Sequence, residues 1–235
     1  MRVYGGKGMT MLDDLYYPNG ESLHKCVIGT SGSGKSYFIE ETAKAFLKTV
    51  KDPEYRMVYF SPKNEGFLDL MDKKQKPVYD VGGMLRQIEK HRVVVFYPDA
   101  TGLEETMDDT INALFDLKDS NPDFKVSLII DDSQVFLSSR KRASDAFTRL
   151  ALLGRSRNIN AMYVSHAVVL NKSLEGQIDQ IALFSLPAKI HWKATEERYG
   201  FNPEPYIDRL KQQKYSFLYV DIRTSFVQPM NPIGE

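Results

Sequence analysis

Short apolar runs alternate with longer amphipathic segments along most of the chain. The apolar runs are five or six residues long, and they predict strands at residues 23–28, 56–60, 92–96, 126–130, 161–165, 181–186 and 217–222. Segments with apolar residues at every third or fourth position predict helices at residues 35–50, 84–91, 102–117, 139–154 and 203–213. Strands that alternate with helices build a parallel sheet with helices on both faces, so the pattern predicts an α/β fold with a mainly parallel central sheet.

The 235 residues suit one domain. Residues 1–22 have weak periodicity and a Pro-Asn-Gly turn at 18–20, which indicates an N-terminal strap before the core. We therefore expect a single domain over residues 23–235, with residues 187–235 as a C-terminal extension of that same domain.

Charge is balanced over the whole chain but uneven along it. The sequence has 31 basic and 31 acidic residues, so net charge does not indicate nucleic acid or membrane as a partner. Residues 99–123 carry eight acidic residues and one lysine, whereas residues 138–160 carry six basic residues and one aspartate. This asymmetry predicts either two solvated faces or a site that meets phosphate.

Compartment follows from cysteine and hydropathy. The one cysteine, Cys26, lies in an apolar run and excludes a disulfide within the chain, which favours a reducing cytoplasm. The first residues do not form the apolar segment of a signal peptide, and no run approaches 18 apolar residues. We expect a soluble intracellular protein without membrane insertion.

A glycine-rich loop between the first predicted strand and the first predicted helix carries the clearest chemistry. It matches G-x-x-x-x-G-K-[ST] in full, and its residues are Gly29, Thr30, Ser31, Gly32, Ser33, Gly34, Lys35 and Ser36, with Tyr37 next. Glycines let backbone N–H groups approach a phosphate, and the helix N-terminus directs its positive dipole at the anion. A chance match in a Gly/Ser loop is the alternative, but the flanking strand and helix are the context that the motif requires. The motif predicts that residues 23–36 bind the phosphates of ATP or GTP with Mg²⁺.

Two residues of this motif have specific expected roles. Lys35 reaches the β- and γ-phosphates as a point charge, and the hydroxyl of Ser36 binds Mg²⁺.

Two acids end the apolar run at residues 126–130. Asp131 directly follows this predicted strand and is the expected Mg²⁺ residue; a simple acidic strand cap is the alternative. Asp132 is expected to orient or deprotonate the attacking water, although it could instead cap the next segment. Together with the glycine-rich loop, the pair predicts nucleotide hydrolysis.

These motifs together resemble the HerA–FtsK superfamily of P-loop ATPases. The likeness rests on the phosphate loop, the two acids after an apolar strand, a basic helix leading to Gly-Arg-x-Arg-Asn-Ile at 154–159, and a strand ending in a polar pair at 165–166. It covers residues 20–186, and the short single-domain chain is most similar to genome-packaging ATPases of membrane-containing icosahedral viruses. The resemblance implies a three-layer RecA-like (ASCE) fold in which the strand ending at Ser165 lies between the loop strand and the Asp131 strand.

Two positions depart from the pattern of this superfamily. Its catalytic acid is usually Glu, and Asp132 is one methylene shorter. The polar pair is usually Thr-Gln or Ser-Gln, whereas this chain has Ser165-His166; His166 would then contact the γ-phosphate or the water as a sensor.

The resemblance also implies partners. The superfamily works as a ring, so we expect a hexamer on double-stranded DNA in which Arg155 or Arg157 of one subunit completes the site of the next; a basic surface turn is the alternative. Arg155 is slightly favoured because Gly154 could present it at a helix end, and Arg140, Lys141 and Arg142 are candidates for contact with DNA phosphates. Capsid vertex proteins are further expected partners, and the location is the host cytoplasm during virus assembly or a virion vertex.

Two other functions remain open. A nucleotide or nucleoside kinase also uses a P-loop, and the basic residues at 140–157 could form its lid. A non-catalytic module that uses nucleotide to lock an assembly is compatible with Asp132 in place of Glu. An ATP-binding-cassette protein is excluded because the chain has no Leu-Ser-Gly-Gly-Gln-like segment.

Overall fold

The structure, a computed structural model, describes residues 22–137, 142–166 and 172–231. Apart from Ser22, the expected N-terminal strap therefore lies outside the described residues, as do Arg140 and Lys141.

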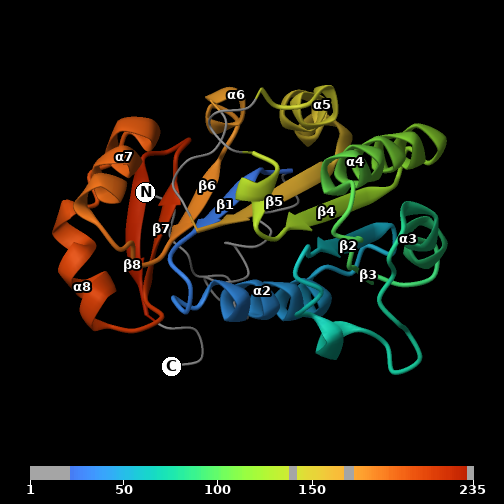
Figure 1. Ribbon diagram of the computed structural model, residues 1–235, viewed down its shortest axis with the longest axis horizontal. Coiled ribbons are helices and arrows are strands. Elements are labelled where there is room, and N and C mark those ends of the chain that lie inside the picture. The colour runs from blue at the N-terminus through green and yellow to red at the C-terminus, as the bar shows by residue number, and fades with distance from the viewer. Residues whose placement is uncertain (1–21, 138–141, 167–171, 232–235) are drawn as a thin grey trace.

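The described residues form one eight-stranded sheet with the order β3-β2-β4-β5-β1-β6-β7-β8 (Figure 1). The strands are β1 (Lys25–Ile28), β2 (Tyr55–Phe60), β3 (Val93–Phe96), β4 (Lys125–Ile130), β5 (Ile159–Ser165), β6 (Gln180–Leu183), β7 (Phe217–Asp221) and β8 (Phe226–Met230). The pairs among β1 to β6 are parallel, while β7 runs antiparallel to β6 and β8 antiparallel to β7. The mainly parallel sheet is confirmed, and so is the position of β5 between β1 and β4.

Helices cover both faces of the sheet, as predicted. They are α2 (Lys35–Thr49), α3 (Val81–Ile88), α4 (Leu103–Ser120), α5 (Asp145–Leu153), α6 (Lys172–Glu175), α7 (Lys189–Tyr199) and α8 (Ile207–Gln212), with short 3₁₀ turns η1 (Leu68–Leu70), η2 (Ser133–Val135), η3 (Arg155–Arg157) and η4 (Glu204–Tyr206). Strand side chains alternate between two cores. Cys26 and Ile28 pack in the core on the side of α3 to α8, and Val27 packs in the core between α2 and the sheet. Figure 1 shows α2 below the sheet and α4 and α5 above it.

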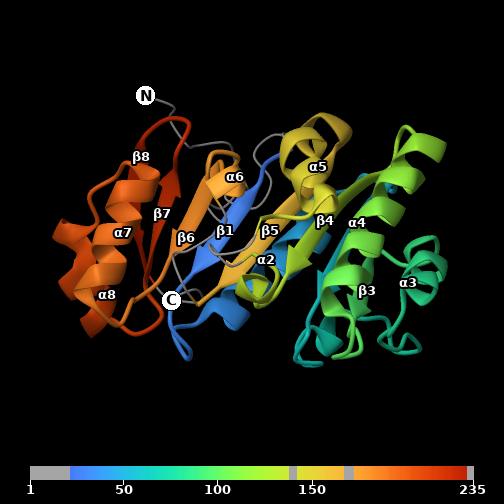
Figure 2. The same cartoon turned by 45° about the horizontal axis from the view of Figure 1, so that its top comes forward.

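The acidic and basic regions of the sequence lie next to each other in space. They form α4 and the α5–η3 segment, which are neighbours in both cartoon views (Figures 1 and 2). Asp119 on α4 pairs with Arg157 at 2.9 Å and with Arg149 at 3.8 Å, and the Arg149 guanidinium lies 4.0 Å from the centre of the Phe115 ring. The two charged regions thus neutralise each other in part.

One predicted helix begins later than expected, and α7 and β8 were not predicted. The helix expected at 139–154 begins only at Asp145, because Ser144 caps it by accepting a hydrogen bond from the Phe147 amide at 3.2 Å. Helix α7 was missed because its buried residues, Trp192, Thr195 and Tyr199, are too few and too mixed to make an apolar stripe. The edge strand β8 was missed because its residues are only partly buried.

Candidate nucleotide site

Four parallel strands end at the same edge of the sheet, and the loops after them hold polar residues. β1 leads into the glycine-rich loop, β4 into Asp131 and Asp132, β5 into His166, and β2, the neighbour of β4, into Lys63. In open α/β sheets, ligands bind at this carboxyl edge. The topology therefore brings loops far apart in the sequence around one point.

The glycine-rich loop has the backbone that its sequence predicts. Gly34, which directly precedes α2, has φ +106°, a conformation that an L side chain rarely adopts. Gly29 is required for a different reason, since a Cβ there would lie 2.5 Å from the Cβ of Phe184. The Ser33 hydroxyl is buried without a hydrogen-bond partner among the described residues, which suits a loop built to receive phosphate oxygens.

Lys35 lies inside the loop that precedes it. Its ammonium donates to the carbonyl oxygens of Gly29 and Thr30, each at 2.8 Å, and approaches His166 Nδ1 at 3.2 Å. Burial lowers the pKa of Lys35 to about 8, against the opposing charge of Asp131. The side chain is therefore still mostly cationic at neutral pH.

The other loop residues sit at the rim. Ser31, Ser36 and Tyr37 are exposed, and Thr30 is fixed by hydrogen bonds from its amide and its hydroxyl to the Ser185 carbonyl at 3.1 and 3.3 Å. The serine expected to bind a metal ion is thus open to solvent at the first turn of α2.

Asp131 is buried at the end of β4. Its Oδ2 accepts a hydrogen bond from the Tyr59 hydroxyl at 3.0 Å, and its Oδ1 accepts one from the Asp132 amide at 2.9 Å. Burial, together with the neighbouring charge of Asp132, raises the pKa of Asp131. A nearby cation would reverse this shift by stabilising the ionised form.

Asp132 is held by three donors. Lys63 Nζ lies 2.8 Å from Oδ2, while Gln134 Nε2 and His166 Nε2 each lie 3.1 Å from Oδ1. Burial alone would raise the pKa of Asp132, but these donors outweigh it, and the pKa lies below its usual value. The backbone at Asp132 has φ +48°, a left-handed conformation that Asp and Asn tolerate better than other side chains.

His166 connects the loop lysine to the second acid. Burial and the Lys35 charge lower its pKa, so the ring is neutral at pH 7. A neutral ring has one donor and one acceptor nitrogen. Because Lys35 can only donate, Nδ1 accepts from Lys35 and Nε2–H donates to Asp132. The His166 amide also donates to Gln134 Oε1 at 3.3 Å, which fixes the loop.

The sequence motifs identify neither Lys63 nor Gln134 as a site residue. The Lys63 ammonium nevertheless pairs with Asp132. The signal that could have found it is topological: Lys63 follows β2, and β2 adjoins β4. Gln134 lies two residues after Asp132, in η2, which is anchored to β5 by a 3.0 Å hydrogen bond from Ser133 Oγ to the Val164 carbonyl.

A magnesium ion fits the chemistry of this edge. Mg²⁺ prefers oxygen ligands, keeps several waters and takes only one or two carboxylates beside substrate phosphates. The Asp131 carboxylate and the Ser36 hydroxyl supply such ligands, and the described residues contain no denser cluster of His, Cys, Asp or Glu. These two residues would hold Mg²⁺ together with the nucleotide.

The two candidate finger arginines lie at the amino end of β5, whereas the glycine-rich loop lies at the carboxyl ends of the strands. Both precede β5, whose seven residues span about 20 Å, so neither can reach its own glycine-rich loop. Arg155 pairs with Asp179 at 2.7 Å, and Arg157 pairs with Asp119 at 2.9 Å. Of the three candidates for DNA contact, Arg142 is the one that lies within the described residues, and it is exposed.

The motif around these arginines has a separate structural reason. A Cβ at Gly154 would lie 2.4 Å from the Leu150 carbonyl oxygen and 2.6 Å from that of Ile159, and Asn158 has φ +56°. Glycine and asparagine are therefore needed to turn the chain from α5 into β5.

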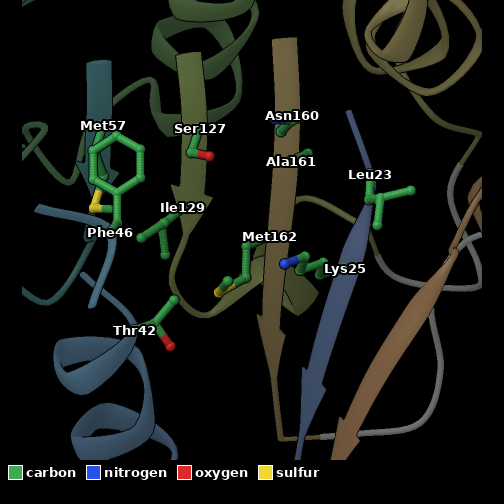
Figure 3. A pocket seen from close by; sticks show the side chains of 10 residues that line it. All are labelled: Leu23, Lys25, Thr42, Phe46, Met57, Ser127, Ile129, Asn160, Ala161 and Met162. Carbon is green, nitrogen blue, oxygen red and sulfur yellow. The ribbon is translucent and has the colours of Figure 1, made fainter. Parts of the chain in front are cut away.

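A cavity of about 30 Å³ lies near the amino ends of the strands, between α2 and the sheet (Figure 3). Lys25 and Met162, partners on adjacent strands, face it together with Asn160 and Phe46. Burial and the charge of Arg223 lower the pKa of Lys25 to about 7. The volume suits one or two waters, not a nucleotide.

The glycine-rich loop, the acids after β4 and the strand inserted between them define a P-loop NTPase fold. Comparisons with known proteins add to this assignment. A family model described as RNA helicase matches residues 25–84. No curated protein sequence matches the chain.

Solved structures of the same fold include viral packaging enzymes. The genome packaging NTPase B204 from Sulfolobus turreted icosahedral virus 2, in complex with ATP-gammaS, superposes with a TM-score of 0.70 at 17% identity over 95% of this chain and 100% of that one. The DNA-packaging ATPase B204 from Sulfolobus turreted icosahedral virus gives 0.68 at 20% identity over 90% and 98%. EccC of Thermomonospora curvata gives 0.54 at 11% identity, over 91% of this chain and 37% of that one. The expected resemblance is thus confirmed for the fold.

Within the described part of the chain, no helix combines the length and the apolar character needed to cross a membrane. The structure brings Lys35, Asp131, Asp132 and His166 together and leaves Arg155 and Arg157 apart; the chemical roles of all six stay predictions.

Proposed function

We propose that this chain hydrolyses ATP with Mg²⁺ and uses the energy to move double-stranded DNA into a viral capsid. The observation that carries the hydrolytic step is the connected series Lys35–His166–Asp132–Lys63 at the carboxyl edge of the sheet. It joins the residue expected at the γ-phosphate to the acid expected at the attacking water.

The geometry suits water activation. Asp132 is ionised at neutral pH because its pKa is lowered, so it accepts a hydrogen bond from water at all working pH values. A weakly basic carboxylate is sufficient, since phosphoryl transfer passes through a loose transition state in which positioning matters more than full deprotonation. Lys63 and Gln134 fix the carboxylate. His166 contacts both Lys35 and Asp132, so a movement of Lys35 toward phosphate would change the hydrogen bond that His166 donates to Asp132.

Asp131 and Ser36 would hold Mg²⁺ beside the nucleotide, and the ion would neutralise part of the phosphate charge. Asp131 supplies a buried anion for it, and the Tyr59 hydroxyl orients that carboxylate. Lys35, with two loop carbonyls as partners, exchanges them for phosphate oxygens.

Topology separates this proposal from a kinase. In hydrolases whose acid activates water, an extra strand lies between the loop strand and the strand of the acid. β5 occupies that place, pairing with β1 on one side and β4 on the other. This arrangement disfavours the nucleotide-kinase alternative.

DNA packaging is proposed from the shared fold and from the superfamily resemblance. The B204 enzymes are described as packaging enzymes, and this chain covers nearly their whole length. We expect binding through phosphates, without sequence preference and with a steep dependence on salt. A binding constant insensitive to salt would contradict it.

A phosphate-release assay with and without double-stranded DNA separates the possible functions. Stimulation by DNA supports the translocase. Transfer of phosphate to a small hydroxyl acceptor would support the kinase, and nucleotide binding without turnover would support the assembly module. The control is the Lys35→Ala variant, which must be inactive under all conditions.

We also propose a homo-oligomeric ring, hexameric by resemblance, that forms with ATP and DNA and contacts capsid vertex proteins. Arg155 and Arg157 lie about 20 Å from their own glycine-rich loop, so either could act only on a neighbouring subunit. An arginine finger would contribute a factor of about 10³ or more to the rate.

Subunit mixing tests the ring. Protein with Lys35→Ala but intact arginines should rescue protein that lacks both arginines but keeps its loop. Thermal melting of each variant shows that it is folded. Purely additive activity at all mixing ratios, where assembly is confirmed, would exclude an arginine acting between subunits.

A further inference from the structure

Tyr215 stands in an unfavourable backbone conformation beside the glycine-rich loop. It lies in the turn between α8 and β7 and has φ +67°, where aromatic residues are rarely found. Two hydrogen bonds from Ser216 to the Gln213 carbonyl, from its amide at 3.2 Å and from its hydroxyl at 2.7 Å, close this turn. Such strain persists where the surrounding fold imposes it, and it gathers at binding sites.

The turn places the Tyr215 ring against the last glycine of the loop. An atom at the Cβ position of Gly34 would lie 3.0 Å from Cδ1 of the ring and 3.4 Å from its Cβ. Both cartoon views show the segment before β7 next to the loop that enters α2 (Figures 1 and 2). The contact does not bury the side chain, because Tyr215 is still 44% exposed.

The strand order decides which part of a nucleotide would reach Tyr215. Asp131, Asp132 and His166 lie on the β5 and β4 side of the loop, whereas Tyr215 lies on the β6 and β7 side. A triphosphate whose γ-phosphate faces the acids must extend its α-phosphate and nucleoside in the opposite direction. That direction leads to the Tyr215 ring.

We propose that Tyr215 is the platform on which the base of the bound nucleotide stacks. The inference rests on the proposed function, since it assumes that the glycine-rich loop holds the phosphates. The Lys214 ammonium lies 4.6 Å from the centre of the ring, over one face, so the base occupies the other face. The C-terminal extension thereby contributes a ligand contact to the site, and every purine offers the flat surface that this contact needs.

The test compares two probes on the full chain by calorimetry, both with Mg²⁺. One is a non-hydrolysable ATP analogue, and the other is inorganic tripolyphosphate, which has no base. Tyr215→Asn removes the ring with a residue that tolerates positive φ, and Tyr215→Trp keeps a stacking surface. Tyr79→Asn is the matched control, because Tyr79 is a 62% exposed tyrosine next to β3, at the other end of the sheet.

We expect Tyr215→Asn to weaken binding of the ATP analogue by about tenfold or more, the scale of base–aromatic stacking, and to leave tripolyphosphate binding unchanged. Tyr215→Trp should bind both probes like the wild type, and so should Tyr79→Asn. Equal weakening of both probes by Tyr215→Asn would show that the ring supports the loop and would overturn the proposal. An unchanged affinity for the analogue would overturn it too. If wild-type protein bound neither probe, the nucleotide site itself would be refuted, an outcome visible before any variant is made.

Discussion

Replacing Asp132 with asparagine is the sharpest test of the hydrolytic mechanism. The backbone there has φ +48°, which asparagine adopts readily, so Asp132→Asn keeps both the fold of the turn and the volume of the side chain. What it removes is the negative charge and one acceptor oxygen. Longer or branched replacements would confound this loss with backbone strain, and by the same reasoning Asp132→Glu should not restore the usual acid of the superfamily.

The magnitude follows from the contacts of the carboxylate. Three donors converge on it: Lys63 at 2.8 Å, Gln134 at 3.1 Å and His166 at 3.1 Å. An asparagine amide can satisfy the two donors at Oδ1 with its oxygen, but its NH₂ group then faces the Lys63 ammonium. The variant therefore loses both the base and the fixed orientation of the water. We expect kcat to fall at least about 100-fold, or about 2.7 kcal/mol in activation free energy, the lower end of the usual range for general-base catalysis.

Phosphate release at saturating ATP and Mg²⁺ measures kcat, and calorimetry measures nucleotide affinity separately. Affinity should stay within a few-fold of wild type, because the Asp132 carboxylate bonds to Lys63, Gln134 and His166, which lie outside the glycine-rich loop. Asp116→Asn on the exposed side of α4 is the matched control and should be fully active. An Asp132→Asn enzyme that turned over at the wild-type rate would show that Asp132 is not the base, and the series from Lys35 to Lys63 would then have no catalytic meaning.

Four further predictions rest on contacts of the same structure. Lys35→Ala should abolish turnover in the phosphate-release assay, because no other described cation lies inside the loop. Wild-type turnover should fall as pH drops through the pKa of His166, which lies below its usual value, because a protonated Nδ1 no longer accepts from the lysine; His166→Gln should lack this acid limb in a pH–rate profile. Lys63→Met should lower kcat about fivefold, a modest effect because the Lys63 side chain is 43% exposed and solvent screens its charge, and sedimentation should show unchanged assembly. Arg155→Ala should lower the melting temperature by about 2–4 °C, since it leaves the buried Asp179 carboxylate without its cation.

Local signals explain why much of the carboxyl edge could be predicted. The glycine-rich loop and the two acids are each contiguous in sequence, and each adjoins an apolar run that a strand pattern identifies. Even the place of β5 between β1 and β4 followed, because the superfamily resemblance fixed the strand order. Such features depend on neighbours along the chain, which a sequence displays directly.

Contacts between distant segments explain what was missed. Lys63 and Asp132 are 69 residues apart and meet only because β2 and β4 pair in register, with Phe60 level with Ile130. Tyr215 contacts Gly34 because the turn before β7 has a positive φ at Tyr215, and no residue pattern predicts that conformation. In both cases the information lies in the strand order, so it becomes readable only after the fold is known.

The two candidate arginines differ in the burial of their ion-pair partners. Sequence favoured Arg155 slightly, because Gly154 could present it at a helix end, but Gly154 is required there by the close approach of two carbonyl oxygens. Arg155 is also the ion-pair partner of Asp179, whose side chain is only 3% exposed, so turning toward a neighbouring subunit would strand a buried carboxylate. Arg157 pairs with Asp119, which is 48% exposed and can be rehydrated at little cost. An arginine finger must break its ion pair within its own subunit to reach the site of the next subunit, so a weak ion pair favours this role. By that criterion Arg157 is the better candidate for the finger.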